Sequence, residues 1–392
     1  MSNALFLALA YMRHHLARSL IMVAAIALIL IVPFATQQVL RSAEAQLTAR
    51  AEATPLMVGS RGSALDLMMN GLYFSDDRPE PVTRAASERI WDSDLAVAIP
   101  LLVRYKAGGQ PVVGTTLDYF DFRELEVAQG RPLAVLGEAV LGATAAKRLG
   151  LTPGDTLISD PENLFDLAGS YPLEMQVVGV LAPTGTADDN AVFVDINTAW
   201  VIEGLGHGHD DVIDADAVVG QEGGNLTAFA GLTQFTRITP QNIDSFHFHG
   251  PPEDYPLSAV IAVPWDARAS AVLRGRYLEP GETTQIVVPE QVVQGLLATL
   301  FRIGRVLDAV FVIVGAAALI AVALAFYLSL RLRRDEMDTA FRLGSHRLMI
   351  SRLLGAELVV TFAVAALLAV AVLAALAPYI DDLSIWLITQ EA

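Results

Sequence analysis

Three long uncharged stretches constrain this chain more than any other feature. They cover residues 19–40, 309–330 and 358–380, and they are 22, 22 and 23 residues long. A helix needs about 20 apolar residues to cross a bilayer core about 30 Å thick. Each stretch is therefore predicted to be a transmembrane helix. None of them contains a charged residue that would line a polar pathway through the membrane.

The first stretch has two interpretations. An Ala-Glu-Ala triplet at 43–45 is compatible with a signal-peptidase site, which would make the stretch a cleaved signal. However, the uncharged run is longer than a typical signal core of about 7–15 residues. We therefore favour a retained helix. Residues 1–18 are predicted to form an amphipathic helix whose basic end places the N-terminus in the cytoplasm.

The segment 331–357 lies between the second and third stretches and contains six arginines. Together with residues 1–18 it holds 8 basic and 4 acidic residues, a balance of +4. The remainder holds 18 basic and 39 acidic residues, a balance of −21. Positive loops stay in the cytoplasm, so the acidic bulk is predicted to lie on the opposite side of the membrane. A surface this acidic excludes nucleic acid as a partner.

The chain lacks the motifs of several enzyme classes. Its only two lysines are Lys106 and Lys147, and neither ends a G-x-x-x-x-G-K-[ST] phosphate-binding loop. There is no G-x-S-x-G, no H-E-x-x-H and no cysteine. We expect a non-catalytic chain, and if ATP drives it, the ATP binds to another subunit.

Residues 41–306 have the alternating texture of an α/β domain, which we expect to be inserted between the first two of three membrane helices. Segments 101–106 and 110–115 flank Gly108 and Gly109 and predict a hairpin. Residues 138–149 predict a helix that ends at Gly150.

Histidines form the clearest candidate site. His207 and His209 form one H-x-H pair, followed by Asp210, and His247 and His249 form another. Alternate residues of a strand share a face, so each pair can present two imidazoles together. Four imidazoles, or three with a carboxylate, suit Zn²⁺. The alternative is a solvated acidic loop in which the histidines are incidental.

A second candidate site lies within 331–357. Met337, Ala340 and Phe341 follow helical spacing and form one apolar stripe, and Gly344 can end that helix. The stripe can fit a groove on a partner protein. Alternatively, the helix lies on lipid headgroups, with Arg342 near the phosphates.

Several stretches of the chain resemble the permease subunits of ABC transporters of the MacB/FtsX/LolC type. Segment 331–357 is similar to the family's coupling segment, through the Ala-Phe-Arg-Leu-Gly-Ser run at 340–345 and the later Glu357. Segments 129–157 and 177–180 resemble its periplasmic core domain, and 58–67 resembles the first element of that domain. The order of span, large domain and further spans extends the likeness over most of the chain.

The resemblance implies a specific architecture. The periplasmic α/β domain has two subdomains, a porter-like part at about 41–125 and 257–300 and an inserted part at about 126–256. Membrane helices at 19–40, 307–330 and 358–380 anchor it, 331–357 is the cytoplasmic coupling segment, and 381–392 is a periplasmic tail. Family members usually have four spans, whereas this chain has three.

The resemblance also implies partners and a function. It implies a homodimer in the bacterial inner membrane that binds two copies of an ATPase carrying ATP and Mg²⁺, and that converts ATP hydrolysis into motion of its periplasmic domain (mechanotransmission of the type VII kind). The resemblance further implies a periplasmic protein or metal partner, since the histidine-rich loop is similar to that of members in zinc-handling systems. The alternative is an FtsX-like regulator that activates a periplasmic enzyme without transport. The coupling residues would be the following: Met337, Ala340, Phe341, Arg342, Leu343, Gly344 and Glu357. Glu357 pairs with an arginine or another subunit in one interpretation, and is a simple interfacial carboxylate in the other.

Overall fold

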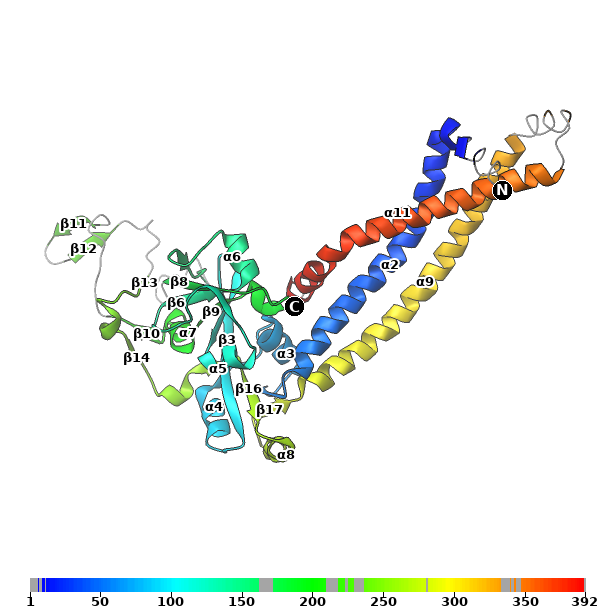
Figure 1. Cartoon of the computed structure of the whole chain (residues 1–392). Coiled ribbons are helices and arrows are strands. Elements are labelled where there is room, and N and C mark those ends of the chain that lie inside the picture. Colours follow the sequence, from blue (N-terminus) through cyan, green and yellow to red (C-terminus); the bar gives the residue numbers. More distant parts are fainter. Residues whose placement is uncertain are drawn as a thin grey trace. The chain divides into compact units, whose positions relative to one another are not determined.

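A computed structural model shows two compact units (Figure 1). A helical unit comprises Met1–Ala45 and Gly295–Ser384, and a sheet unit comprises Gln46–Gln294 and Ile385–Ala392. The structure describes the chain apart from residues 1–5, 7–8, 11, 162–171, 209–217, 223–224, 229–235, 280, 333–338, 340–341, 343–346 and 391–392.

Three long helices build the helical unit: α2 (Leu16–Glu52), α9 (Pro289–Leu332) and α11 (Arg347–Gln390). Within the part of the chain that the structure describes, three segments are long and apolar enough to cross a membrane: Leu16–Glu52, Val306–Leu328 and Gly355–Ile380. The predicted stretches 19–40, 307–330 and 358–380 are thus confirmed as apolar helices. Residues 381–390, predicted as a tail, continue α11 as helix.

The helical unit has a small packed seam and large apolar outer faces. Val23, Ile26 and Ala27 of α2 are buried together with Ala365 of α11. On α9, by contrast, Val312 is 72% exposed, and many other large apolar side chains of the three helices are exposed as well. Such continuous apolar faces are normal where the surroundings are lipid.

The sheet unit is built on an 11-stranded mixed sheet. Its main path runs β13-β8-β6-β9-β4-β3-β16-β1-β17, and β5 and β7 pair with β8. The strands are β1 (Leu56–Ser60), β3 (Ala96–Ala107), β4 (Gln110–Thr115), β5 (Val127–Gly130), β6 (Glu138–Leu141), β7 (Thr156–Ile158), β8 (Leu173–Leu181), β9 (Val192–Asp195), β13 (Thr236–Arg237), β16 (Ala259–Pro264) and β17 (Thr284–Val287). The predicted α/β class is confirmed.

Short helices and small ladders complete the sheet unit. The α-helices are α3 (Ala64–Tyr73), α4 (Arg84–Trp91), α5 (Leu117–Phe122), α6 (Ala143–Leu149), α7 (Ile196–Ile202) and α8 (Ala267–Arg276). The 3₁₀ turns are η1 (Ala187–Asn190), η3 (Ile243–Ser245) and η4 (Pro252–Asp254). Three two-stranded ladders pair β2 (Val82–Thr83) with β15 (Pro256–Leu257), β10 (Gly206–His207) with β14 (His247–Phe248), and β11 (Val218–Glu222) with β12 (Asn225–Ala228).

The strands at one edge of the sheet connect to the long helices. β1 begins four residues after α2 ends at Glu52, and β17 ends two residues before α9 begins at Pro289. β1 and β17 are antiparallel neighbours, with Met57 opposite Val287 and Ser60 opposite Thr284. The chain therefore enters and leaves the sheet through two paired strands.

The predicted hairpin around Gly108 and Gly109 is confirmed. β3 and β4 pair antiparallel, and the two glycines have φ of +57° and +74°. Two consecutive positive φ values are what a tight hairpin turn requires, and glycine adopts them without steric cost.

The predicted helix 138–149 is wrong in its first part. Residues Glu138–Leu141 form β6, which is buried along its whole length between β8 and β9, and only Ala143–Leu149 is helical. A strand buried on both faces shows no alternation, so sequence periodicity does not distinguish it from a helix. Gly142 lies between the two elements. Only glycine fits there, because a Cβ would lie 2.2 Å from the Asp188 carbonyl oxygen. The predicted stop at Gly150 is confirmed by a left-handed cap.

Candidate functional site

The histidine cluster is formed by two segments that are distant in the sequence. β10 follows α7, and β14 follows η3; Figure 1 labels both strands. They pair antiparallel, with His207 directly opposite His247. His249 lies two residues beyond His247, and its backbone N–H donates to the Leu205 carbonyl at 2.9 Å. One possible ligand atom from each of the three imidazoles lies within 4.8 Å of the others.

The opposite face of this ladder is anchored in the hydrophobic core. Phe246 and Phe248 alternate with the histidines and pack against the buried cluster of the sheet unit. The facing strand has room for them because it carries glycine: a Cβ on Gly206 would lie 2.8 Å from the Phe248 ring, and one on Gly208 would lie 2.7 Å from the Phe246 ring. Core packing thus holds the strands in the register that brings the imidazoles together.

One histidine is oriented by the backbone. The Nδ1 atom of His247 lies 3.2 Å from the Ser245 carbonyl oxygen. A carbonyl only accepts hydrogen bonds, so Nδ1 carries the proton in this contact and Nε2 keeps the lone pair. This is the arrangement by which proteins orient a metal-binding histidine.

The structure brings together three of the five predicted metal ligands. His207 and His249 are exposed, and His247 is half-buried. The other two, His209 and Asp210, lie outside the described residues. Zn²⁺ holds imidazole nitrogens at about 2.0–2.1 Å, so tetrahedral ligand atoms stand roughly 3.4 Å apart. The present spacing fits a metal after small side-chain rotations.

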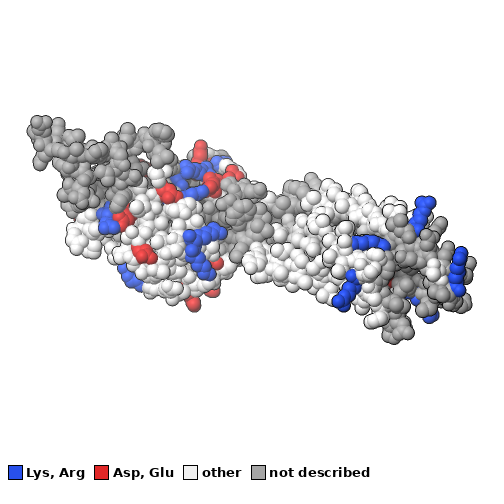
Figure 2. Space-filling view, turned by 90° about the horizontal axis from the view of Figure 1, so that it is seen from above, with Lys and Arg blue, Asp and Glu red and all other residues white. Residues whose placement is uncertain are grey.

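Most of the predicted coupling residues are not described. Met337, Ala340, Phe341, Leu343 and Gly344 lie outside the described residues, and Arg342 is an exposed helical residue. In Figure 2 the basic side chains of the helical unit gather at one end, whereas the adjoining stretch is uncharged.

Glu357 lies on α11 and is buried in the helical unit. One of its carboxylate oxygens is 4.0 Å from an Arg18 guanidinium nitrogen on α2. This contact favours the interpretation in which Glu357 pairs with an arginine, here one from the same chain.

A buried ionic network in the sheet unit was not predicted. Arg50, in the last turn of α2, donates two hydrogen bonds to the Asp188 carboxylate, at 2.6 Å to Oδ2 and 2.9 Å to Oδ1. The Tyr119 hydroxyl accepts from Arg50 at 2.9 Å and donates to Asp188 at 2.7 Å. Burial alone raises the pKa of Asp188, but the Arg50 charge and these hydrogen bonds outweigh burial and lower that pKa to about 2. Burial raises the pKa of Tyr119.

The adjacent acids Asp188 and Asp189 do not share their partners. Asp189 turns away from the network and accepts hydrogen bonds from the backbone N–H groups of Thr184 and Gly185, at 2.9 and 2.8 Å. The two carboxylates therefore have separate structural partners and do not form an acid/base couple.

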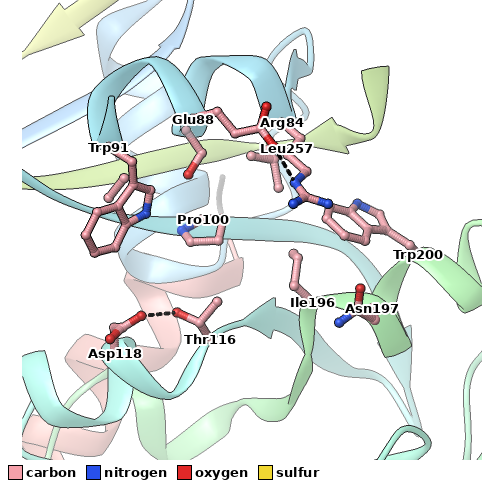
Figure 3. A pocket seen from close by; sticks show the side chains of 12 residues that line it. Arg84, Glu88, Trp91, Pro100, Thr116, Asp118, Ile196, Asn197, Trp200 and Leu257 are labelled. Carbon is pink, nitrogen blue, oxygen red and sulfur yellow. Dashed lines mark hydrogen bonds and ion pairs between the residues drawn. The ribbon is translucent and has the colours of Figure 1, made fainter. Parts of the chain in front are cut away.

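A pocket of about 240 Å³ lies among α4, β3, α5 and α7. Figure 3 shows Trp91 and Trp200 on opposite sides with Pro100 between them. Its charged groups have partners in its own wall: Arg84 pairs with Glu88 at 3.0 Å, and Asp118 accepts from the Thr116 hydroxyl at 3.0 Å. The described lining offers apolar contact rather than a reactive constellation.

Fold and sequence together define a class of membrane protein: a mixed α/β domain lies in the chain between the first two of the three membrane-capable helices that the structure describes. Comparison of the sequence with known protein families then identifies the family. The family model described as the MacB-like periplasmic core domain matches residues 19–221, just over half of the chain. The chain therefore belongs to the MacB-like family of ABC transporter permeases. This membership makes it a membrane subunit of the ABC transporter type and implies an ABC ATPase partner.

Solved structures of related domains are also similar to the chain, at low identity. The periplasmic region of MacB from Actinobacillus actinomycetemcomitans is 11% identical, with a TM-score of 0.35, over 64% of this chain and 97% of that one. The extracellular domain of the noncanonic ABC-type transporter YknZ from Gram-positive bacteria is 13% identical, with a TM-score of 0.33, over 59% and 98%. A domain of a putative permease protein from Porphyromonas gingivalis is 10% identical, with a TM-score of 0.28, over 59% and 86%. A search of curated proteins by sequence finds no match.

Proposed function

We propose that this chain is a non-catalytic permease that couples ATP hydrolysis on a separate ATPase to motion of its periplasmic domain. It acts as a homodimer with two ATPase copies in the bacterial inner membrane. The connection between helices and sheet carries the proposal. α2 and α9 continue into the paired strands β1 and β17 with three and one intervening residues. Because these connections are so short, motion at the end of either helix is transmitted directly to the β1–β17 pair.

The Arg50–Asp188 contact supports the same function. Arg50 belongs to the last turn of α2, and Asp188 belongs to η1, which leads into the central strand β9. A buried, doubly hydrogen-bonded ion pair resists separation, because either charge left alone in the interior is costly. A displacement of the end of α2 is thus passed to the centre of the sheet as well as to its edge.

The ATPase is proposed to contact the segment 331–357. In that segment the predicted stripe of Met337, Ala340 and Phe341, flanked by Arg342 and the turn at Leu343 and Gly344, would fit a groove on the ATPase. Glu357, buried beside Arg18, would position α11, the helix on which it lies.

The experiment is co-purification of the ATPase with the full-length chain from membranes. The double variant Phe341→Ala/Arg342→Glu should lose the ATPase. The control Trp265→Ala/Arg268→Glu likewise replaces an aromatic residue by alanine and an arginine by glutamate, at two exposed positions in the sheet unit, and should retain the ATPase. Equal retention by both double variants would contradict the proposed coupling segment.

We also propose that a divalent metal such as Zn²⁺ takes part in this function, as cargo or as a signal from a periplasmic partner. The support is the cluster of His207, His247 and His249 in the sheet unit. Imidazoles favour zinc and similar transition metals over Mg²⁺ or Ca²⁺, which prefer oxygen ligands.

A further inference from the structure

We infer that His207, His247 and His249 form a transition-metal site of the zinc class in which the metal acts as a clip between β10 and β14. Binding at this site is independent of the proposed permease function. Only the role of metal occupancy in transport or regulation rests on that function.

The first observation is the size of the ladder that the metal would hold. β10 and β14 pair over only two residues each, Gly206 with Phe248 and His207 with His247. The ladder closes a segment of 39 residues, 208–246. Closing a long segment costs conformational entropy, and a metal clip is one way to offset that cost. A metal bound by His207 on one strand and His247 on the other would hold the closure directly.

The second observation is that the three imidazole rings lie close together. The centroids of the three imidazoles lie 4.6–5.0 Å apart, and the rings of His207 and His249 are nearly parallel, with an interplanar angle of 25°. The cluster has anchors on two sides: the half-buried phenylalanines that pack on the core and the Ser245 carbonyl that contacts His247 Nδ1. Because that contact directs the lone pair to Nε2, the orientation needed for a metal ligand is present in the fold.

The third observation concerns coordination number. The described residues supply three nitrogen ligands, and a tetrahedral Zn²⁺ site takes one more ligand. Structural zinc sites are closed by four protein ligands, whereas sites with three keep an open position. Since His207 and His249 are exposed, the metal has a direct path from solvent. This access suits a metal that exchanges with solvent.

The test uses the full-length chain in detergent, purified through a tag without histidine and stripped with a chelator. Calorimetric titration with Zn²⁺ should show one ion per chain. Co²⁺, a spectroscopic substitute for Zn²⁺, should give the absorption of a tetrahedral site. Mg²⁺ should not bind at this site. Saturating Zn²⁺ should also raise the thermal midpoint of the sheet unit, because a ligand of the folded state stabilises it.

The variants are chosen so that folding is preserved. His207→Ala/His249→Ala removes two exposed imidazoles and should weaken Zn²⁺ binding at least 100-fold and abolish the thermal shift. The control His14→Ala/His15→Ala removes two exposed imidazoles from the helical unit and should change neither quantity. Metal-free thermal midpoints of all three proteins, compared first, show that each is folded.

The outcomes separate the site from its role. No Zn²⁺ binding by the wild-type chain, or binding that survives in His207→Ala/His249→Ala, overturns the site. If the site binds Zn²⁺ but Zn²⁺ leaves ATP hydrolysis by the permease–ATPase complex unchanged, the site stands and its link to the proposed function fails. A Zn²⁺-dependent change in hydrolysis that is lost in the double variant supports both.

Discussion

Arg50 and Asp188, 138 positions apart in the sequence, form a buried bidentate ion pair at 2.6 and 2.9 Å. Their side chains are only 5% and 2% exposed. The pair fastens the last turn of α2 to the turn that precedes β9. Since water is excluded from both groups, each depends on the other for the stability of its charge.

Removal of one partner should therefore destabilise the sheet unit strongly. Asp188→Ala leaves the Arg50 charge buried without its carboxylate, and we expect a loss of about 3–5 kcal/mol. The matched control is Asp76→Ala, which breaks the Asp76–Lys106 pair at the same 2.6 Å distance but at exposed positions. Exposed pairs contribute about 0–1 kcal/mol. Denaturant unfolding followed by near-ultraviolet circular dichroism measures the free energy of unfolding of both variants. Similar losses of stability in the two would contradict the dependence of Arg50 on Asp188.

The same pair predicts a pH range in which acid lowers the stability of the folded chain. The pKa of Asp188 is lowered to about 2 in the folded chain, against an ordinary aspartate value of about 3.9. A depressed folded pKa contributes stability that is fully present above about pH 4 and is lost as the pH falls through about 2. The contribution at neutral pH is about 2–3 kcal/mol.

Tyr119→Phe should move this pH range upward. The substitution removes the hydroxyl that donates to Asp188, so the folded pKa of Asp188 should rise and acid destabilisation should begin at higher pH. Parallel unfolding series of wild type and Tyr119→Phe between pH 2 and about pH 6 isolate the effect from the other carboxylates. Superimposable pH profiles would contradict the assigned role of Asp188.

Gly142 should not tolerate a side chain. A Cβ there would lie 2.2 Å from the Asp188 carbonyl oxygen and 2.5 Å from that of Asp189, and backbone atoms cannot rotate away. We expect Gly142→Ala to cost several times the roughly 1 kcal/mol typical of a substitution. In the control Gly275→Ala, on α8, the new Cβ meets nothing within 4 Å, and helix propensity predicts a gain of up to about 1 kcal/mol. Equal thermal midpoints for the two variants would contradict the close approach.

ATP hydrolysis should distinguish a transporter from a regulator. If the chain is a transport permease, hydrolysis by the reconstituted permease–ATPase complex should rise with transported substrate in the absence of any periplasmic protein. A regulator should respond only to its protein partner. The relevant measurement is steady-state phosphate release in proteoliposomes with each addition separately. Stimulation by protein partner alone would favour the regulatory alternative.

Sequence reasoning predicted the elements whose signal is local. Long uncharged runs mark the three apolar helices, because bilayer thickness alone sets their length. The β3–β4 hairpin was predicted because Gly108 and Gly109 are the residues its turn requires. Strand β6 was predicted as helix, since four buried residues show no periodicity that separates the two states.

The candidate sites were predictable to different degrees. His247 and His249 share a strand face by alternation, but only the β10–β14 register brings His207 opposite them. The roles of His209 and Asp210 remain predictions. The Arg50–Asp188 pair was missed because nothing local distinguishes Arg50 from the other basic residues near helix ends, and the contact arises only from tertiary folding.

The pairing of β1 with β17 has an evolutionary consequence. Because the chain enters and leaves the α/β domain through neighbouring strands, the domain is a cassette inserted between two helices, and insertions with adjacent ends are well tolerated. Its distal surfaces, including the histidine ladder, can diverge or be exchanged without rebuilding the two strands at the junction. The binding surfaces of the domain can thus change in evolution while its connection to the two helices stays the same.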